Sequence, residues 1–106
     1  MSALVRRNLS FIRLLISTNT KQQKALFNTI TREQVKSIIE ITYNIINLGI
    51  RVSPADRTKL IRHVTLLKDI GIKKQSIKKK TVLIKSKGKI IISMLKAVIS
   101  TIEKIV

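Results

Sequence analysis

The sequence predicts an all-α fold, a small bundle of five or six short helices. Apolar residues recur at spacings of three and four through most of the chain, as on one face of an amphipathic helix. Serine, threonine and asparagine precede several of these runs, and glycine or proline interrupts them, as is typical of helix ends. Alternation with a period of two is not sustained anywhere, although Ile90-Ile91-Ile92 has strand propensity.

The chain is short enough for a single domain, and its first part, residues 1–49, is predicted to be an apolar helical half. A first helix is expected from Leu4 to Ile16, before the stretch 17–20, which is rich in capping residues. A second, short helix is expected over residues 21–29. Its predicted buried residues are Ala25, Leu26 and Phe27.

A third helix is predicted to begin at Thr31 and to end near Leu48, before Gly49. Thr31 and Gln34 fit a capping box, in which each side chain accepts a hydrogen bond from the other residue's backbone amide. Helical spacing places its apolar residues on one face. These are Val35, Ile38, Ile39, Ile45 and Ile46, and Thr42 shares the face.

Residues 53–89 are predicted to be a basic helical half. Ser53 caps a helix that has Pro54 in its first turn, where proline loses no hydrogen bond, and Gly71 ends it. The residues expected to face inward are Leu60, Ile61, Val64, Leu67 and Ile70. Ser76 is expected to cap a further short helix, and residues 87–89 form a break.

The last segment, residues 90–106, is predicted to be an amphipathic terminal helix. It has two interpretations. Either its apolar face closes the bundle, or it is a membrane-active segment with Lys87, Lys89 and Lys96 near lipid headgroups. The apolar face consists of Ile91, Met94, Leu95, Val98, Ile102 and Ile105.

The charge of the chain is concentrated between Arg57 and Lys89. This third of the sequence carries twelve basic residues against Asp69 alone, and so supplies +11 of the net charge of +17. The chain is also 44% apolar, which is atypical of a disordered basic tail. Such unbalanced charge repels itself unless a polyanion neutralises it, and nucleic acids and anionic membranes are the common polyanions of cells.

These observations favour a non-catalytic protein that binds nucleic acid independently of sequence. Lysine outnumbers arginine, and lysine is a point charge rather than a bidentate reader of base edges. The aromatic residues are only Phe11, Phe27 and Tyr43, too few for a base-stacking platform.

Catalysis and cofactors have little support in the sequence. The chain lacks cysteine, which excludes disulfides and cysteine-held zinc, and His63 is its single histidine. No cofactor or metal is therefore expected. Glu40 follows Lys36 by four residues, which is salt-bridge spacing on a helix. No uncharged apolar run is long enough to predict a membrane-spanning helix.

The order of several short motifs resembles the small basic proteins of Maverick/Polinton elements and the related adintoviruses. The resemblance covers about residues 11–95 and rests on FIRLL at 11–15, TKQQKAL at 20–26, EQV at 33–35, YNI at 43–45, VSP at 52–54 and SIKKK at 76–80. That group is similar in turn to the adenovirus minor core protein X (mu). Relatives often have paired glycines before the hydrophobic end; this chain has Lys87-Gly88-Lys89, which leaves proteolytic processing open.

The resemblance implies a virion-core protein that compacts double-stranded DNA, located in the virion core or the host nucleus. By matching position, it also implies which residues contact phosphate. These are Lys59, Arg62, Lys68, Lys73, Lys74, Lys78, Lys79, Lys80, Lys85 and Lys87. RNA stays open as the ligand, and the N-terminal half is a candidate surface for a homo-oligomer. One alternative is a capsid-internal or membrane-active structural protein, with capsid proteins or anionic membrane as partners. A weaker alternative is a small basic ribosomal or organellar protein. Without the resemblance, the expected location is intracellular, not secreted, although the acid-free N-terminus also fits a mitochondrial presequence.

Overall fold

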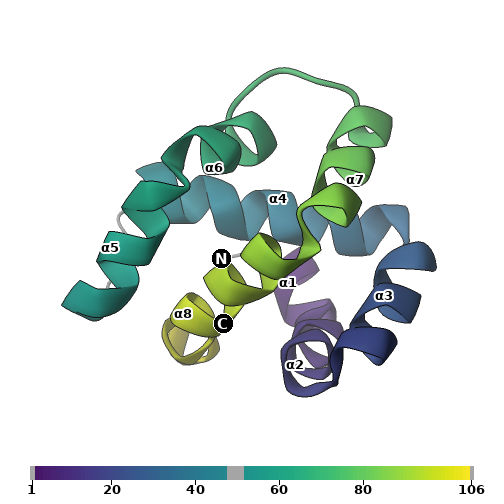
Figure 1. Cartoon of the computed structure of the whole chain (residues 1–106), viewed down its shortest axis with the longest axis horizontal. Helices are drawn as coiled ribbons and strands as arrows, with labels where there is room; N and C mark the ends of the chain where they lie inside the picture. Colours follow the sequence, from purple (N-terminus) through teal and green to yellow (C-terminus); the bar gives the residue numbers. More distant parts are fainter. Residues whose placement is uncertain (1, 48–51, 106) are drawn as a thin grey trace.

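A computed structural model describes residues 2–47 and 52–105, and this part of the chain folds into eight helices without strands (Figure 1). The predicted all-α class is confirmed, with more helices than the five or six expected. Leu48, Gly49 and Val106, which appear in the predicted helix ends, lie outside the described residues. The helices are α1 (Ala3–Arg7), α2 (Leu9–Ser17), α3 (Thr20–Asn28), α4 (Arg32–Asn47), α5 (Pro54–Arg62), α6 (Val64–Gly71), α7 (Ile77–Ser86) and α8 (Gly88–Ile105).

The first predicted helix is divided at Asn8 into α1 and α2. The Asn8 backbone leaves the helical region (φ −100°, ψ 7°). Its side-chain Nδ2 donates a hydrogen bond to the Leu4 carbonyl at 2.8 Å, and so satisfies part of the end of α1. Asparagine offers the backbone such an alternative to continued helix, which explains a break that apolar spacing alone does not reveal.

The helix predicted after Ser53 is likewise divided, at His63, into α5 and α6. The His63 N–H bonds to the carbonyl of Leu60 instead of continuing the α-helical ladder. The break allows α5 to pack on α8 while α6 packs on α4. The inward positions predicted for Ile61 and Val64 are wrong, because these side chains, beside the break, are 61% and 40% exposed.

Two smaller predictions also need correction. The terminal helix begins at Gly88 rather than Ile90, so the break before it shrinks to Lys87. Ala25 is exposed, whereas Phe27 is buried and Leu26 is partly buried. The short α3 therefore turns Phe27 toward the core and leaves Ala25 in solvent.

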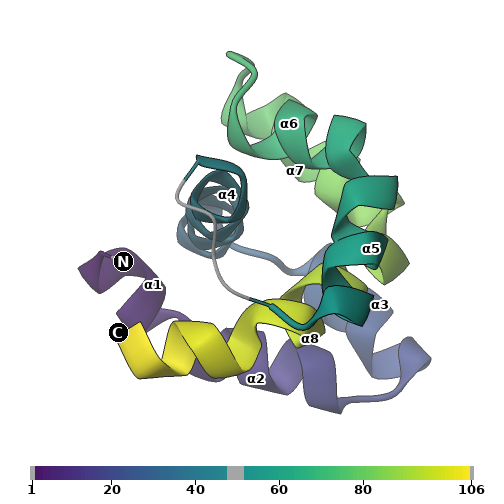
Figure 2. The same ribbon diagram turned by 90° about the vertical axis from the view of Figure 1, so that its left-hand side faces the viewer.

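The helix α4 runs through the middle of the molecule, and Figure 2 shows it nearly end-on with other helices around it. It contacts α1, α6 and α7. The predicted capping box is present, since Thr31 Oγ1 accepts from the Gln34 amide at 3.1 Å and Gln34 Oε1 accepts from the Thr31 amide at 2.9 Å. The inner face of α4 is apolar, as expected for a helix packed between others. Its side chains are fully or almost fully buried, and they are Val35, Ile38 and Ile41.

The packing of α6 on α4 is unusually close at Gly71. A Cβ atom at this position would lie 2.8 Å from the backbone nitrogen of Tyr43 and 3.1 Å from the carbonyl carbon of Thr42. Backbone atoms in a central helix cannot move aside cheaply. Gly71 was predicted as a helix stop; it is the last residue of α6 and also the contact that sets how near α6 approaches α4.

The helix α8 contacts α2, α3, α5 and α7 from the other side of the core. Its residues Ile91, Leu95, Val98 and Ile102 have no exposed surface. The interpretation in which this face closes the bundle therefore describes the structure. Near its end, Glu103 accepts a hydrogen bond from the Nε of Arg13 at 3.0 Å, which joins α8 to α2.

The N-terminal helix is attached to α4 by two polar contacts. Arg7 pairs with Glu33 at 2.8 Å, and the Ser2 hydroxyl donates to Glu40 at 2.7 Å. The salt bridge expected between Glu40 and Lys36 is not among the ion pairs of the described residues, and Glu40 accepts hydrogen bonds from Ser2 instead. The hydrogen bond and charge of Arg7, together with a hydrogen bond from Asn8, hold the pKa of Glu33 below its usual range.

Replacing Gly71 by alanine should destabilise the fold by about 1–3 kcal/mol, because the new methyl group would overlap the α4 backbone. Denaturant unfolding followed by circular dichroism measures this. Thr65→Ala, at an exposed position of α6, is the control and should change stability by less than about 0.5 kcal/mol. A Gly71→Ala variant as stable as the parent would contradict the close approach.

Replacing Arg7 by alanine should raise the pKa of Glu33 toward its ordinary value. The pKa of Glu33 is lower in the folded chain, so the pair stabilises the fold at neutral pH, and this contribution is lost as pH falls through the lowered pKa. Carboxyl chemical shifts followed by NMR over acidic pH measure the change. Arg6→Ala, on the same helix, is the control, and equal Glu33 titrations in parent and Arg7→Ala proteins would rule out the pair in solution.

Candidate functional site

The basic segment between Arg57 and Lys89 forms most of α5, all of α6 and α7 and the first residues of α8 (Figure 1). Ser53 Oγ accepts a hydrogen bond from the Asp56 amide at 3.2 Å, with Pro54 in the first turn of α5. Ser76 Oγ accepts from the Lys79 amide at 3.2 Å at the start of α7. Both predicted caps are therefore present, and they fix where the two most basic helices begin.

Nine of the ten predicted phosphate-contacting residues are exposed. Three lie on α5 and α6, two in the connection before α7, and four on α7 or directly after it. Because these side chains are exposed, a ligand in solution can reach their cationic groups. They are Lys59, Arg62, Lys68, Lys73, Lys74, Lys78, Lys79, Lys85 and Lys87.

Lys80 is the exception, because only 7% of its surface is exposed. It lies four residues before the fully buried Ile84, so the two share the inner face of α7. Long lysine stems often cover apolar surface in this way. Lys80 therefore differs in exposure from its neighbours Lys78 and Lys79. Three consecutive lysines in a sequence do not by themselves show this difference.

The acids of the chain leave the exposed cationic groups unneutralised. Among the described residues, both ion pairs use arginines of the N-terminal half, Arg7 and Arg13. Asp56 accepts a hydrogen bond from Ser53 in its own helix cap. Asp69, the single acid of the basic segment, lines a shallow hollow with Lys73 and Lys79 but forms no ion pair with either among the described residues.

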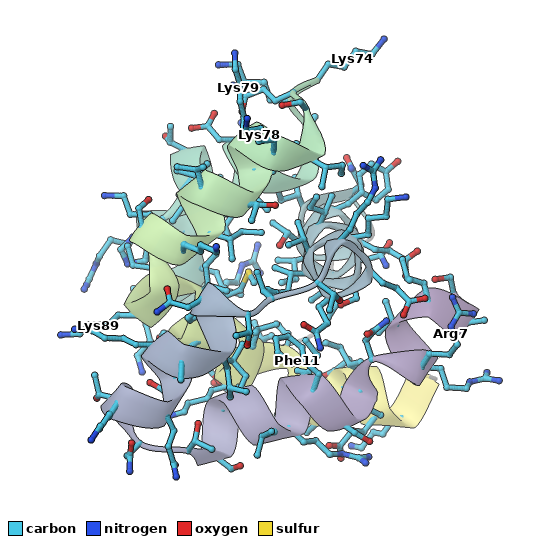
Figure 3. All side chains as sticks on the ribbon, turned by 90° about the vertical axis from the view of Figure 1, so that its right-hand side faces the viewer. Arg7, Phe11, Lys74, Lys78, Lys79 and Lys89 are labelled. Atoms are coloured by element: carbon cyan, nitrogen blue, oxygen red, sulfur yellow. The ribbon has the colours of Figure 1, made fainter. Side chains whose placement is uncertain are left out.

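The exposed lysines gather at two places. Lys74, Lys78 and Lys79 extend into solvent together at one end of the molecule, at the start of α7 (Figure 3). Lys85, Lys87 and Lys89 surround a cavity at the junction of α7 and α8, where Lys24 of α3 joins them. The sequence predictions missed Lys24 because it is about sixty positions away and outside the charged segment. A surplus of basic over acidic residues before Glu33 is the only signal that pointed toward it.

Within residues 2–47 and 52–105, no group of histidine and acidic side chains is clustered as a metal site would require. His63 is partly buried at the α5–α6 break, beside Lys59, Leu67 and Met94. Of the helices in the described part of the chain, none has the length and apolarity to span a bilayer.

Comparison with protein-family models, with curated proteins and with solved structures finds no match for this chain. The resemblance to proteins of Maverick/Polinton elements and to adenovirus protein X therefore stays a prediction from short motifs. The candidate site is defined by its geometry and charge alone.

Replacing Ser76 by alanine should loosen the first turn of α7 and cost about 1 kcal/mol of stability, because the Lys79 amide loses its acceptor. Hydrogen exchange of the Lys79 amide should become faster than the loss of global stability alone explains. Exchange of the α4 amides should change only by the amount that this loss explains. Ser100→Ala, on the exposed face of α8, is the matched control. Unchanged exchange at Lys79 would show that the cap does not hold the lysines in place.

Proposed function

We propose that this protein binds nucleic acid without catalysis and independently of sequence, and that double-stranded DNA is its ligand. One observation supports the proposal above the others: nine predicted contact residues are exposed on one contiguous stretch of helices, and neither ion pair of the described residues involves them. A folded domain gains no stability from such self-repulsion. Binding to a polymer of phosphates removes this repulsion, and the release of counterions condensed on the nucleic acid drives the binding.

Phosphate contact, rather than base reading, suits the chemistry of these side chains. Eight of the nine are lysines, whose ammonium groups act as point charges without the planar fork by which arginine reads guanine. Of the aromatic side chains, Phe27 is buried and Phe11 packs against the core. Tyr43 is half-exposed on α4, where its backbone lies against Gly71 of α6, and it is a single ring. A row of stacked bases has no platform among them.

The virion-core role is the further part of the proposal. In it, the protein lies beside a packaged genome and lowers the repulsion between neighbouring duplexes, as the resemblance to Maverick/Polinton proteins and adenovirus protein X implies. A small, rigid scaffold with cationic groups on several helices suits this task, because it can touch more than one duplex.

The membrane-active alternative is less well supported by the burial of α8. Its apolar residues Ile91, Leu95, Val98 and Ile102 are covered by other helices, so lipid contact would require part of the fold to open. The ribosomal alternative would use the same cationic surface and differs from the main proposal only in that the bound polymer is RNA instead of DNA. Duplex RNA and duplex DNA of equal length, compared in one assay, distinguish these cases.

Affinity for duplex DNA should fall steeply with salt. If six to eight of the exposed basic residues contact phosphates, the logarithm of the binding constant should fall against the logarithm of salt with a slope of about −5 to −7. Gel-shift or fluorescence-anisotropy titrations with two unrelated sequences measure the slope and any sequence preference. Binding that survives high salt, or that follows one sequence, would contradict the proposal.

A matched pair of variants tests where the contacts lie. Lys79→Ala and Lys80→Met each remove one charge, but only Lys79 is exposed. The first should weaken binding to all sequences alike and reduce the magnitude of the salt slope by about 1. Lys80→Met should change the slope less, since only 7% of the surface of Lys80 is exposed. Equal effects of the two substitutions would show that overall charge, and not this surface, determines binding.

A further inference from the structure

A cavity of about 510 Å³ lies between α3 and the junction of α7 with α8. This volume is within the range of pockets that hold small ligands. Its walls come from parts of the chain that are far apart in sequence, so it exists only in the folded protein. The lining includes Lys24, Phe27, Asn28, Lys85, Lys87 and Lys89, together with Gly88 and Ile90.

The lining of the cavity is rich in lysine. Lys24 comes from α3, and Lys85, Lys87 and Lys89 come from the α7–α8 junction. No acidic residue lines the cavity among the described residues. Four lysines that line one hollow repel each other, and an anion bound there is attracted by their charge.

Part of the lining is apolar. Phe27, which is 5% exposed, and Ile90 belong to it together with Ile92. A Cβ atom at Gly88 would lie 2.9 Å from the Cε2 of the Phe27 ring, so glycine allows the start of α8 to approach the ring. A lining that combines apolar side chains with lysines suits a ligand that is anionic and has an apolar face.

Polar side chains in the lining narrow the choice of ligand further. Gln23 and Ser86 line the cavity but already donate hydrogen bonds to backbone carbonyls, whereas Asn28 and Thr20 line it with polar groups that a ligand can use. An acyl chain would take water from these groups without replacing its hydrogen bonds, which is costly. A nucleobase offers donors and acceptors along its edge and an apolar face, and its phosphate carries the negative charge.

We propose that this cavity binds one unpaired nucleotide of a nucleic acid, with its phosphate among the four lysines and its base against Phe27 and Ile90. This inference rests on the proposed function and deepens it. The surface lysines hold the phosphates of a duplex, and the cavity receives a nucleotide that has left the stack, as at a strand end. Unstacking is least costly for a base that is already unpaired.

Adenosine 5′-monophosphate and inorganic phosphate, each titrated into the ¹⁵N-labelled full-length protein, test the inference. The nucleotide should shift the amide signals of Gly88 and Ile90 and should bind more tightly than inorganic phosphate. Lys24→Ala should weaken nucleotide binding about fivefold, as expected for loss of one exposed charge pair. Lys21→Ala, three residues earlier on α3 and outside the cavity, should leave it unchanged.

Asn28→Leu keeps every charge and should reduce the advantage of the nucleotide over inorganic phosphate. Binding of a blunt DNA duplex by the same samples separates this inference from the proposed function. If the duplex binds, but the nucleotide and inorganic phosphate give equal shifts spread over all lysines, the cavity is not a nucleotide site and the proposed function stands. If the duplex also fails to bind at low salt, the proposed function fails with it.

Discussion

Repulsion among the lysines is the constraint that the rest of the molecule must satisfy. The segment from Arg57 to Lys89 carries +11, and both ion pairs of the described residues lie elsewhere. The fold is therefore held by apolar burial rather than by charge pairing. The central helix α4 and the terminal helix α8 supply most of the fully buried isoleucine, leucine and valine side chains. Burial of this kind is non-directional and tolerates a cationic exterior.

Local features of the chain then decide which lysines face solvent. Gly71 allows α6 to pack directly on the α4 backbone, and Ser76 fixes the first turn of α7 after the connection. Ile84 turns one face of α7 inward and takes Lys80 with it, which leaves Lys78 and Lys79 outside. The cationic surface is thus a consequence of how apolar residues are placed on the same helices.

The sequence carried the fold class and most helix ends, because apolar spacing, the caps at Thr31, Ser53 and Ser76 and the stop at Gly71 are local signals. It did not reveal the breaks at Asn8 and His63, since those depend on which neighbour each half packs against. For the same reason it placed Lys80 among the exposed lysines. Lys24 and the cavity it lines arise from contacts between distant segments, which spacing along one chain does not encode.

If phosphate polymers relieve the repulsion, ligand and salt should both stabilise the folded protein. Thermal unfolding followed by calorimetry at low ionic strength, with and without duplex DNA, measures this most directly. The account predicts that the melting temperature rises with duplex concentration, as binding to the folded state requires, and that salt alone also raises it by screening the lysines. A melting temperature that responds to neither duplex nor salt would contradict it.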